Sequence, residues 1–208
     1  MASSMTLIKP QRHYSGPLLL AACTGISMVL WMSYDMIIPA LPSICDDFGV
    51  SSAITNLLLF PFLLAQAFGQ LVIGTISDRF GRKRVLNISM LVFFLCSVVC
   101  AIAPNIDVLI FVRIPHGFFG GACMILLLTI VTDSYRGRDF DTGMTIMQSL
   151  PVIGPIAAPF LGSLMIALVS WQAVFGLLAV LAGFALLLVL LMDDTLPQEE
   201  RIATTLKE

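Results

Sequence analysis

The sequence has few charged residues and almost no histidine. Charged residues make up 12% of the 208 positions, with 11 Lys and Arg, 13 Asp and Glu, and only 2 His. The net charge of -2 gives no basic surface for nucleic acid. The five cysteines show no metal-ligand spacing, and no nucleophile, metal or phosphate-binding constellation occurs. These absences argue against an enzyme and against nucleic-acid binding, and we expect no cofactor.

Hydrophobic residues, in contrast, make up 58% of the chain. Apolar runs of about 20 residues recur, which is enough to cross a bilayer core about 30 Å thick. The run after Pro17 is too long for a signal peptide and is expected to stay attached. We therefore predict an all-α membrane protein, a bundle of six transmembrane helices. The predicted spans are 17–38, 52–76, 84–103, 107–132, 141–168 and 172–192, between an N-terminal tail (1–16) and a C-terminal tail (193–208).

The basic residues predict the orientation of these spans. Ten of the eleven fall on one side of the predicted bundle, and the loops on the other side carry none. Cytoplasmic loops are enriched in Lys and Arg, so both termini should face the cytoplasm of a multi-pass protein in the inner (plasma) membrane. The ten residues are Lys9, Arg12, Arg79, Arg82, Lys83, Arg84, Arg136, Arg138, Arg201 and Lys207.

Two charged residues lie inside predicted spans. Arg113 lies about 9 Å into the fourth span, and Asp35 lies at a similar depth near the outer end of the first. Each costs about 2.5–3.5 kcal/mol at a helix centre, and such residues usually face the bundle interior and often pair. Two interpretations stay open: a static Asp35–Arg113 ion pair (or Arg113 reaching the outer headgroups), or a carboxylate that responds to protons and substrate. His116 shares a helix face with Arg113, and it either titrates as well or bonds a neighbouring helix.

The fifth predicted span contains an unusual number of residues that disrupt helices. Prolines remove helical hydrogen bonds and favour kinks, whereas small residues allow helices to approach closely. One interpretation is a kinked helix that only packs against its neighbours. The other is a functional element, either a hinge or a tightly packed helix contact that prevents leakage, and the sequence does not separate the two. The residues concerned are Gly143, Pro151, Gly154, Pro155, Pro159 and Gly162.

Four segments resemble one family. The basic loop GTISDRFGRKRVL (74–86) is similar to the signature loop between helices two and three of the major facilitator superfamily. DMIIPALP (35–42), RIPHG (113–117) and the glycine-proline pattern of 154–162 resemble segments of its drug:proton antiporters of the bicyclomycin- and chloramphenicol-resistance type. The resemblance covers nearly the whole chain. It implies the N-terminal six-helix half of a major facilitator fold.

The resemblance also implies roles for individual residues. Asp35 would be the acid that responds to proton and drug, with Arg113 as its coupling partner and His116 as a second candidate. The basic loop would be a cytoplasmic latch in which Gly74 lets helices approach and Asp78 meets a helix N-terminus or a basic residue; its other members are Arg79, Gly81, Arg82 and Lys83. Gly154, Pro155, Pro159 and Gly162 would form the antiporter motif. Positions on the first and fifth spans suggest a cavity lined by Tyr34, Met144, Met147 and Gln148.

The chain departs from the family in two places and in length. Pro115 replaces a bulky apolar residue, and Thr132-Asp133 stands where an Arg-Asp pair is common. Family members have about twelve spans in two halves. The leading hypothesis is therefore proton-coupled efflux of small lipophilic drugs by one half of a carrier, which needs a second six-helix half or a homodimer. The alternatives are a truncated, non-transporting membrane fragment and a small-metabolite carrier of the same fold.

Overall fold

A computed structural model describes residues 5–9 and 11–194. The N-terminal residues 1–4, the tail from 195 onward and therefore the predicted cytoplasmic Arg201 and Lys207 lie outside the described residues. In the described part the helices are α1 (Gly16–Asp35), α2 (Leu41–Phe48), α3 (Ser52–Asn56), α4 (Phe60–Phe80), α5 (Arg82–Ala101), α6 (Ile106–Ser134), α7 (Gly137–Ser149), α8 (Ile153–Leu168) and α9 (Trp171–Leu191), with 3-10 turns η2 (Ile38–Ala40) and η3 (Leu150–Val152).

The predicted fold class is confirmed. The described residues contain no strand, and six helical stretches are long and apolar enough to cross a membrane. Several of these stretches are built from more than one helix, because α1 continues through η2 into α2, α3 into α4, and α7 through η3 into α8. The six stretches are Gly16–Phe48, Ser52–Phe80, Arg82–Ala101, Ile106–Ser134, Gly137–Leu168 and Trp171–Leu191.

The first break between spans lies later than the prolines suggested. The sequence predicts a turn that includes Pro39 and Pro42, but Pro39 lies in the first turn of η2 and Pro42 in the first turn of α2. Proline is tolerated there because the first N–H groups of a helix have no intrahelical partner. The chain turns at Gly49, the last of the residues that predicted this break (with Asp46 and Asp47), and its φ of 61° is the left-handed conformation that glycine adopts at a helix end.

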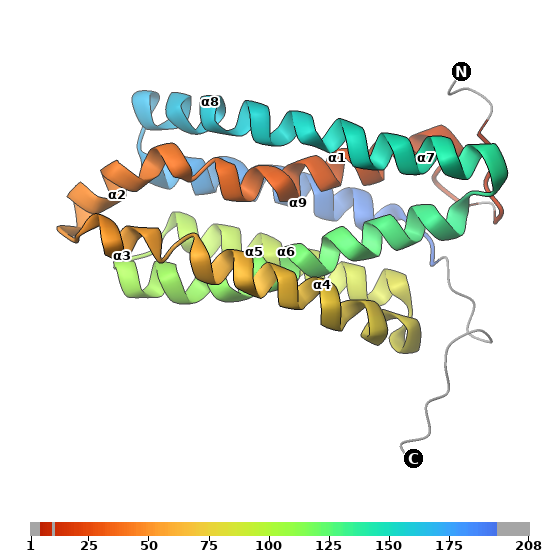
Figure 1. The fold of residues 1–208 in the computed structure, drawn as a ribbon, viewed down its shortest axis with the longest axis horizontal. Helices are drawn as coiled ribbons and strands as arrows, with labels where there is room; N and C mark the ends of the chain where they lie inside the picture. The colour runs from red at the N-terminus through yellow and green to blue at the C-terminus, as the bar shows by residue number, and fades with distance from the viewer. Residues whose placement is uncertain (1–4, 10, 195–208) are drawn as a thin grey trace, which may run out of the picture.

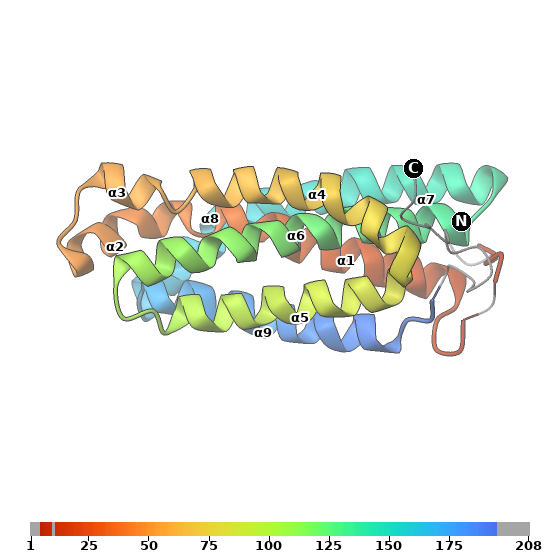
Figure 2. The ribbon, with the colours of Figure 1, turned by 90° about the horizontal axis from the view of Figure 1, so that it is seen from below.

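The helices form two layers (Figure 1). One layer holds α1, α9 and the span formed by α7 and α8. The other layer holds α5, α6 and the span formed by α3 and α4. Within the layers α4 packs chiefly on α6 and α1 on α8, while α5 lies along α9 and joins the layers (Figure 2).

Glycines bring the helices within each layer close together. A Cβ on Gly117 or Gly121 of α6 would overlap the backbone of Phe62 or Gln66 on the α4 side. In the other layer a Cβ on Gly162 of α8 would overlap the Met36 carbonyl that follows α1. Both layers therefore use the small-residue packing that is common between membrane helices.

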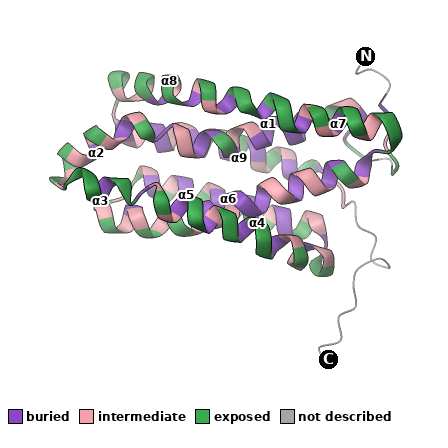
Figure 3. Ribbon diagram, viewed as in Figure 1, coloured by how far each residue is buried: buried purple, intermediate pink, exposed green. Residues whose placement is uncertain are grey.

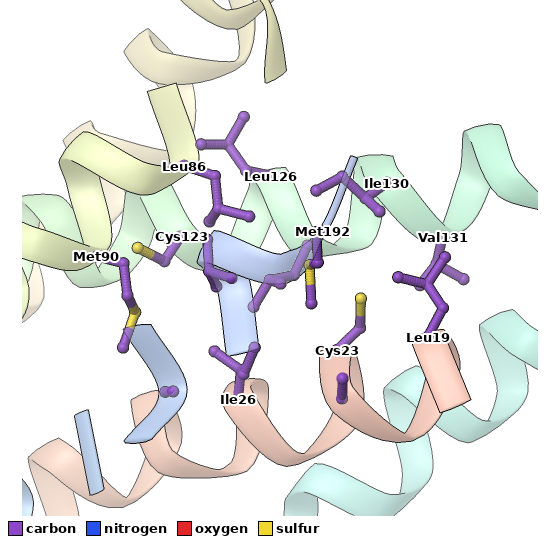
Figure 4. Close-up of a cluster of buried hydrophobic side chains, with 14 of the residues drawn as sticks. Leu19, Cys23, Ile26, Leu86, Met90, Cys123, Leu126, Ile130, Val131 and Met192 are labelled. Atoms are coloured by element: carbon purple, nitrogen blue, oxygen red, sulfur yellow. The ribbon is translucent and has the colours of Figure 1, made fainter. Parts of the chain in front are cut away.

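A buried apolar cluster fills the space where α1, α5, α6 and the end of α9 meet (Figure 4). Its labelled members are Leu19, Cys23, Ile26, Leu86, Met90, Cys123, Leu126, Ile130, Val131 and Met192. Outward-facing positions, in contrast, carry large exposed apolar residues, particularly on α4 and α8 (Figure 3). An apolar interior with an apolar exterior is the pattern expected of a bundle surrounded by lipid.

The N-terminal segment packs against the end of the bundle where α6 and α9 finish. The Ile8 amide donates to the Ser134 carbonyl at 3.0 Å, and the Tyr14 hydroxyl donates to the Leu188 carbonyl at 2.8 Å. Tyr135, between α6 and α7, donates its hydroxyl to the Gly16 carbonyl at 2.5 Å. Burial is the main cause that raises the pKa of both tyrosines above the usual range. These contacts fix part of the predicted N-terminal tail (1–16) to the bundle.

Candidate functional site

Arg113 lies on α6 in the interior of the bundle, and its side chain is fully buried. Its Nε donates to the Leu58 carbonyl and its Nη1 to the Ser33 carbonyl, both at 3.2 Å. Ser33 lies in the last turn of α1, where carbonyl groups lack intrahelical partners, and Leu58 lies in the turn between α3 and α4. Two helix breaks therefore supply the oxygen atoms that solvate this buried cation.

An aromatic ring covers the guanidinium of Arg113. Its central carbon lies 3.8 Å from the centroid of the Phe62 ring, in cation–π geometry. Phe62 also stacks with Tyr34 of α1, at 6.1 Å between ring centroids. The close packing of Gly117 against the Phe62 backbone brings α4 near enough to α6 for this contact.

The static Asp35–Arg113 ion pair, one of the two interpretations left open by the sequence, is absent among the described residues. No carboxylate lies within 4.0 Å of Arg113 among the described residues, and its Nη2 has no hydrogen-bond partner. Asp35 is the last residue of α1, half-buried, and its carboxylate has no hydrogen bond or ion pair with any described residue. The carbonyl of Ser33, two residues earlier, takes the position against Arg113. Depth along a helix, which the sequence gives, does not determine which group of the neighbouring helix faces the guanidinium.

His116 is also fully buried and links Arg113 to α5. Its Nδ1 lies 3.2 Å from Nη1 of Arg113, and its Nε2 lies 3.0 Å from the Ser97 hydroxyl. Ser97 in turn donates to the Phe93 carbonyl at 2.9 Å. Sequence reasoning missed Ser97, because a serine in an apolar helix carries no pattern that marks a bonding partner.

A cleft of about 340 Å³ opens between α1, α4, α6 and the α7–η3 junction. Its walls combine one tryptophan, two thioethers and two amides with aliphatic groups, and none of the lining residues carries a formal charge. The lining residues are Ser27, Trp31, Gln70, Met124, Ile125, Leu128, Met147, Gln148, Pro151 and Val152.

Two of the four predicted lining residues lie in this cleft. Met147 and Gln148 form part of its wall. Tyr34 instead packs on Phe62, and Met144 packs against the apolar core, where its sulfur accepts from the Thr132 hydroxyl at 3.7 Å. Trp31 was missed, although its spacing of four residues from Asp35 places both on one face of α1.

The basic loop makes a tight connection between α4 and α5. Gly81 has φ 91°, which favours glycine, and it is at once the end of α4 and the start of α5. Arg82 then forms ion pairs with Asp78, at 3.5 Å, and with Asp133 at the end of α6. The predicted basic partner of Asp78 is thus Arg82 of the same loop. Asp133 was missed, although the departure at Thr132-Asp133 was the signal that pointed to it.

Other members of the loop have different surroundings. The Lys83 amide donates to an Asp194 carboxylate oxygen at 3.5 Å, while Arg79 is exposed. A Cβ on Gly74 would meet nothing within 4 Å, so Gly74 mediates no close helix contact among the described residues, and its predicted role in helix approach stays a prediction. Close approach in this structure depends on glycines deeper in the bundle.

The glycines of the fifth span face α1, whereas Pro155 and Pro159 are less buried. Gly154, Ala158 and Gly162 are buried at intervals of four residues, and a Cβ on either glycine would overlap a carbonyl of the Met28–Met36 stretch. Pro159 is exposed and Pro155 half-buried on the adjacent face. The 3-10 turn η3, which contains Pro151, interrupts the span. The span therefore combines a packing seam with a break in its helix.

Comparison with known proteins gives a consistent result. The profile of the Major Facilitator Superfamily matches residues 23–207. The chain is 32% identical over 193 residues to "Uncharacterized MFS-type transporter YdgK" of Bacillus subtilis (strain 168), covering 91% of this chain and 48% of that protein. It is 29% identical over 154 residues to "Multidrug resistance protein MdtL" of Klebsiella pneumoniae, covering 74% and 39%. The chain thus spans half or less of the length of these curated relatives.

Solved structures show the same fold. The human organic anion transporter MFSD10 (TETRAN) is similar with a TM-score of 0.72 and 18% identity, over 89% of this chain and 50% of that one. A peptide transporter POT in complex with sulfate gives a TM-score of 0.74 and 20% identity, over 91% and 40%. At these identities the likeness concerns the fold alone.

Proposed function

The chain belongs to the Major Facilitator Superfamily, and on that premise we propose that it is the N-terminal half of a proton-coupled exporter of small lipophilic drugs. Membership of this family, with transporters among its relatives and structural neighbours, indicates transport and not enzymatic catalysis. The name of the MdtL relatives, multidrug resistance protein, supports a drug-like substrate. The exporter would lie in the inner (plasma) membrane with both termini in the cytoplasm.

One observation carries the coupling part of this proposal. The Asp35 carboxylate has no ion pair or hydrogen bond with the described residues, so it can gain or lose a proton without breaking a contact. It lies one helical turn after Trp31, which lines the cleft. A proton on Asp35 would therefore remove a negative charge one helical turn from the cleft wall, and proton entry would favour drug release.

The cleft suits lipophilic ligands. The sulfur atoms of Met124 and Met147 are polarisable and adapt to different shapes, and the Trp31 ring offers a stacking surface. The Gln70 and Gln148 amides supply hydrogen bonds without charge. None of the lining residues is charged, so a cationic drug would find its counter-charge at Asp35, one helical turn beyond Trp31, whereas a neutral drug would need none.

The basic loop and the fifth span have proposed roles in alternating access. Arg82, paired with Asp78 and Asp133, would act as a cytoplasmic latch that holds α4, α5 and α6 together in one access state. The seam of Gly154 and Gly162 against α1 would keep the bundle rigid and closed to protons while it rocks. Asp35, Arg113 and His116 would form the coupling site.

Transport by alternating access needs a second set of spans across the cleft. The apolar side chains exposed on α4 and from η3 through α8 are available for such a partner, which would be a second six-helix half or a second copy of this chain. The exposed residues are Phe60, Leu63, Leu64, Phe68, Leu71 and Val72 on α4, and Leu150, Val152, Ile153, Ile156, Phe160, Leu164 and Leu168 on η3 and α8.

Tryptophan fluorescence tests ligand binding in the chain as it exists. The chain has two tryptophans, of which Trp31 is 51% exposed and Trp171 is 2% exposed. Titration of the chain in lipid nanodiscs with tetraphenylphosphonium, a lipophilic cation, should give saturable quenching in the wild type and in Trp171→Phe. Trp31→Phe should lose this response, and a response that survives in Trp31→Phe would contradict binding in the cleft.

Efflux separates the proposal from its alternatives. Cells that express the chain, with or without a partner half, should accumulate less ethidium than empty cells, and a protonophore should abolish the difference. Quenching without efflux under either condition would favour the truncated, non-transporting fragment. Efflux that survives in Asp35→Asn would contradict proton coupling through Asp35, and transport of a small metabolite without drug efflux would favour the metabolite carrier.

A further inference from the structure

The hydrogen bonds around His116 can be assigned a direction. Arginine has only donors, so the contact of 3.2 Å between Nη1 of Arg113 and Nδ1 of His116 requires Nδ1 to be an unprotonated acceptor. The single proton of a neutral imidazole must then be on Nε2, which donates to the Ser97 oxygen at 3.0 Å. The Ser97 hydroxyl donates its own hydrogen to the Phe93 carbonyl at 2.9 Å. Every donor in this series has an acceptor, and the series runs one way from Arg113 to Phe93.

The other protonation states conflict with the surroundings. A proton on Nδ1 would direct one donor at another, and a doubly protonated ring would place two cations in contact in a site that excludes water. The titratable groups that face this pair are Tyr34 of α1 and Cys100 of α5, and neither is an acid that would balance a second positive charge. The Phe93 ring, 4.4 Å from the imidazole between centroids, completes an apolar enclosure.

We propose that His116 is a neutral positioning residue, fixed as the Nε2–H tautomer by Ser97, and that it holds the guanidinium of Arg113 in place. With Nε and Nη1 both bonded, the plane of the guanidinium is set, and Nη2 is the nitrogen without a partner. Ser97 on α5 thereby acts on Arg113 through the imidazole, without touching it. The position of the coupling arginine would therefore depend on α1 and α5 as well as on α6, its own helix.

This assignment excludes His116 as a second titrating group. Its meaning for transport rests on the proposed role of Arg113, but the tautomer itself is tested without transport. Failure of the tautomer assignment would leave the proposal of drug binding and efflux standing, and absence of efflux would leave the tautomer assignment standing.

Nitrogen NMR of the imidazole measures the tautomer directly. The chain has two histidines, so a His13→Gln variant labelled with ¹⁵N-histidine and held in nanodiscs reports His116 alone. We expect one protonated Nε2 and one bare Nδ1, unchanged between about pH 5 and pH 8, where an ordinary histidine titrates. A protonated Nδ1, or a second proton that appears as the pH falls through this range, would overturn the proposal.

Substitution of Ser97 tests how the tautomer is held. Ser97→Ala should give mixed tautomers or a ring that titrates, whereas Ser97→Thr, which keeps the hydroxyl, should restore the single signal. Ser89→Ala is the matched control, because Ser89 is buried on the same helix but is not among the hydrogen-bond partners of His116.

A binding measurement adds a readout that a packing defect would not produce. The pH dependence of tetraphenylphosphonium quenching should shift in Ser97→Ala and stay unchanged in Ser89→Ala and Ser97→Thr. Because the guanidinium of Arg113 would then have to be ordered when the ligand binds, the affinity in Ser97→Ala should fall about tenfold at neutral pH. An unchanged tautomer and an unchanged pH profile in Ser97→Ala would show that Ser97 positions nothing.

Discussion

Arg113 and Arg82 carry the same guanidinium, but the protein stabilises them in different ways. Arg82 lies near the end of the bundle between two carboxylates, those of Asp78 and Asp133. Arg113 lies in the interior with two backbone carbonyls, an imidazole and an aromatic face, and no acid within ion-pair distance. Ion pairs near water respond to salt and to substitution of either charge, whereas dipoles fixed by the backbone do not.

The comparison explains why the two sites suit different roles. A charge held by carboxylates near the surface can be released when helices separate, because water replaces the lost partner, and this suits a latch. A charge held by fixed dipoles stays in place and leaves the nearby carboxylate of Asp35 free to exchange protons.

The largest difference should come from two glycines, Gly117 of α6 near Arg113 and Gly74 of α4 at the start of the basic loop. Gly117→Leu places a side chain against the Phe62 backbone, which cannot move without separating α4 from α6. We expect a loss of about 3 kcal/mol or more of stability. Gly74→Leu, beside the basic loop, meets nothing within 4 Å and should have little effect. Thermal unfolding in detergent measures both, and equal losses would contradict the assignment of close packing to the interior site.

Replacing each arginine with lysine should have the next largest effect. A lysine at 113 keeps the charge but cannot reach the Ser33 and Leu58 carbonyls and the imidazole together. We expect a loss of about 2 kcal/mol for Arg113→Lys, as for buried acceptors left without donors. Arg82→Lys can still pair with one carboxylate and should lose less than about 1 kcal/mol. Chemical unfolding of the two variants makes the comparison, and a larger loss at 82 would reverse it.

Removal of a neighbouring acid should have a smaller effect, and here the surface site should lose more stability than the interior site. Asp133→Asn breaks an ion pair of Arg82 and should cost about 1 kcal/mol. Asp35→Asn breaks no ion pair, so the unfolding free energy should stay within about 0.5 kcal/mol of the wild type. A clear destabilisation in Asp35→Asn would mean that the carboxylate has a partner on which the fold depends.

Salt should produce the smallest effect. Increasing the ionic strength from low to about 1 M shortens the screening length to about 3 Å and should weaken the pairs of Arg82. The cost of Asp133→Asn should therefore shrink with added salt, while the cost of Arg113→Lys should not change. Unfolding of the wild type and both variants at two salt concentrations tests this, and equal salt sensitivity would place Arg113 in contact with water or ions.

The sequence predicted the larger elements of the fold better than their ends. Uninterrupted apolar length identifies spans, because a bilayer sets the number of residues required. It placed the start of the first break too early, since Pro39 and Pro42 are compatible with the first turns of η2 and α2, and of the predicted break only Gly49 at its end turns the chain.

The candidate site was predicted less completely, for a physical reason. A charge in an apolar run is visible in the sequence, so Asp35, Arg113 and Arg82 were found. The groups that stabilise Arg113 are backbone carbonyls of Ser33 and Leu58, which every residue has and which become available only where helices end. Sequence spacing therefore predicted an ion pair where the fold supplies dipoles.

Proton release on ligand binding tests the central claim, that the carboxylate of Asp35 is unpaired and exchanges protons with the cleft. Tetraphenylphosphonium would be added to the purified chain in weakly buffered solution with a pH indicator, near the pH at which half of the binding is lost. The account predicts proton release in the wild type and in Asp107→Asn, an exposed control at the start of α6, and none in Asp35→Asn. Equal release from Asp35→Asn and the wild type would contradict it.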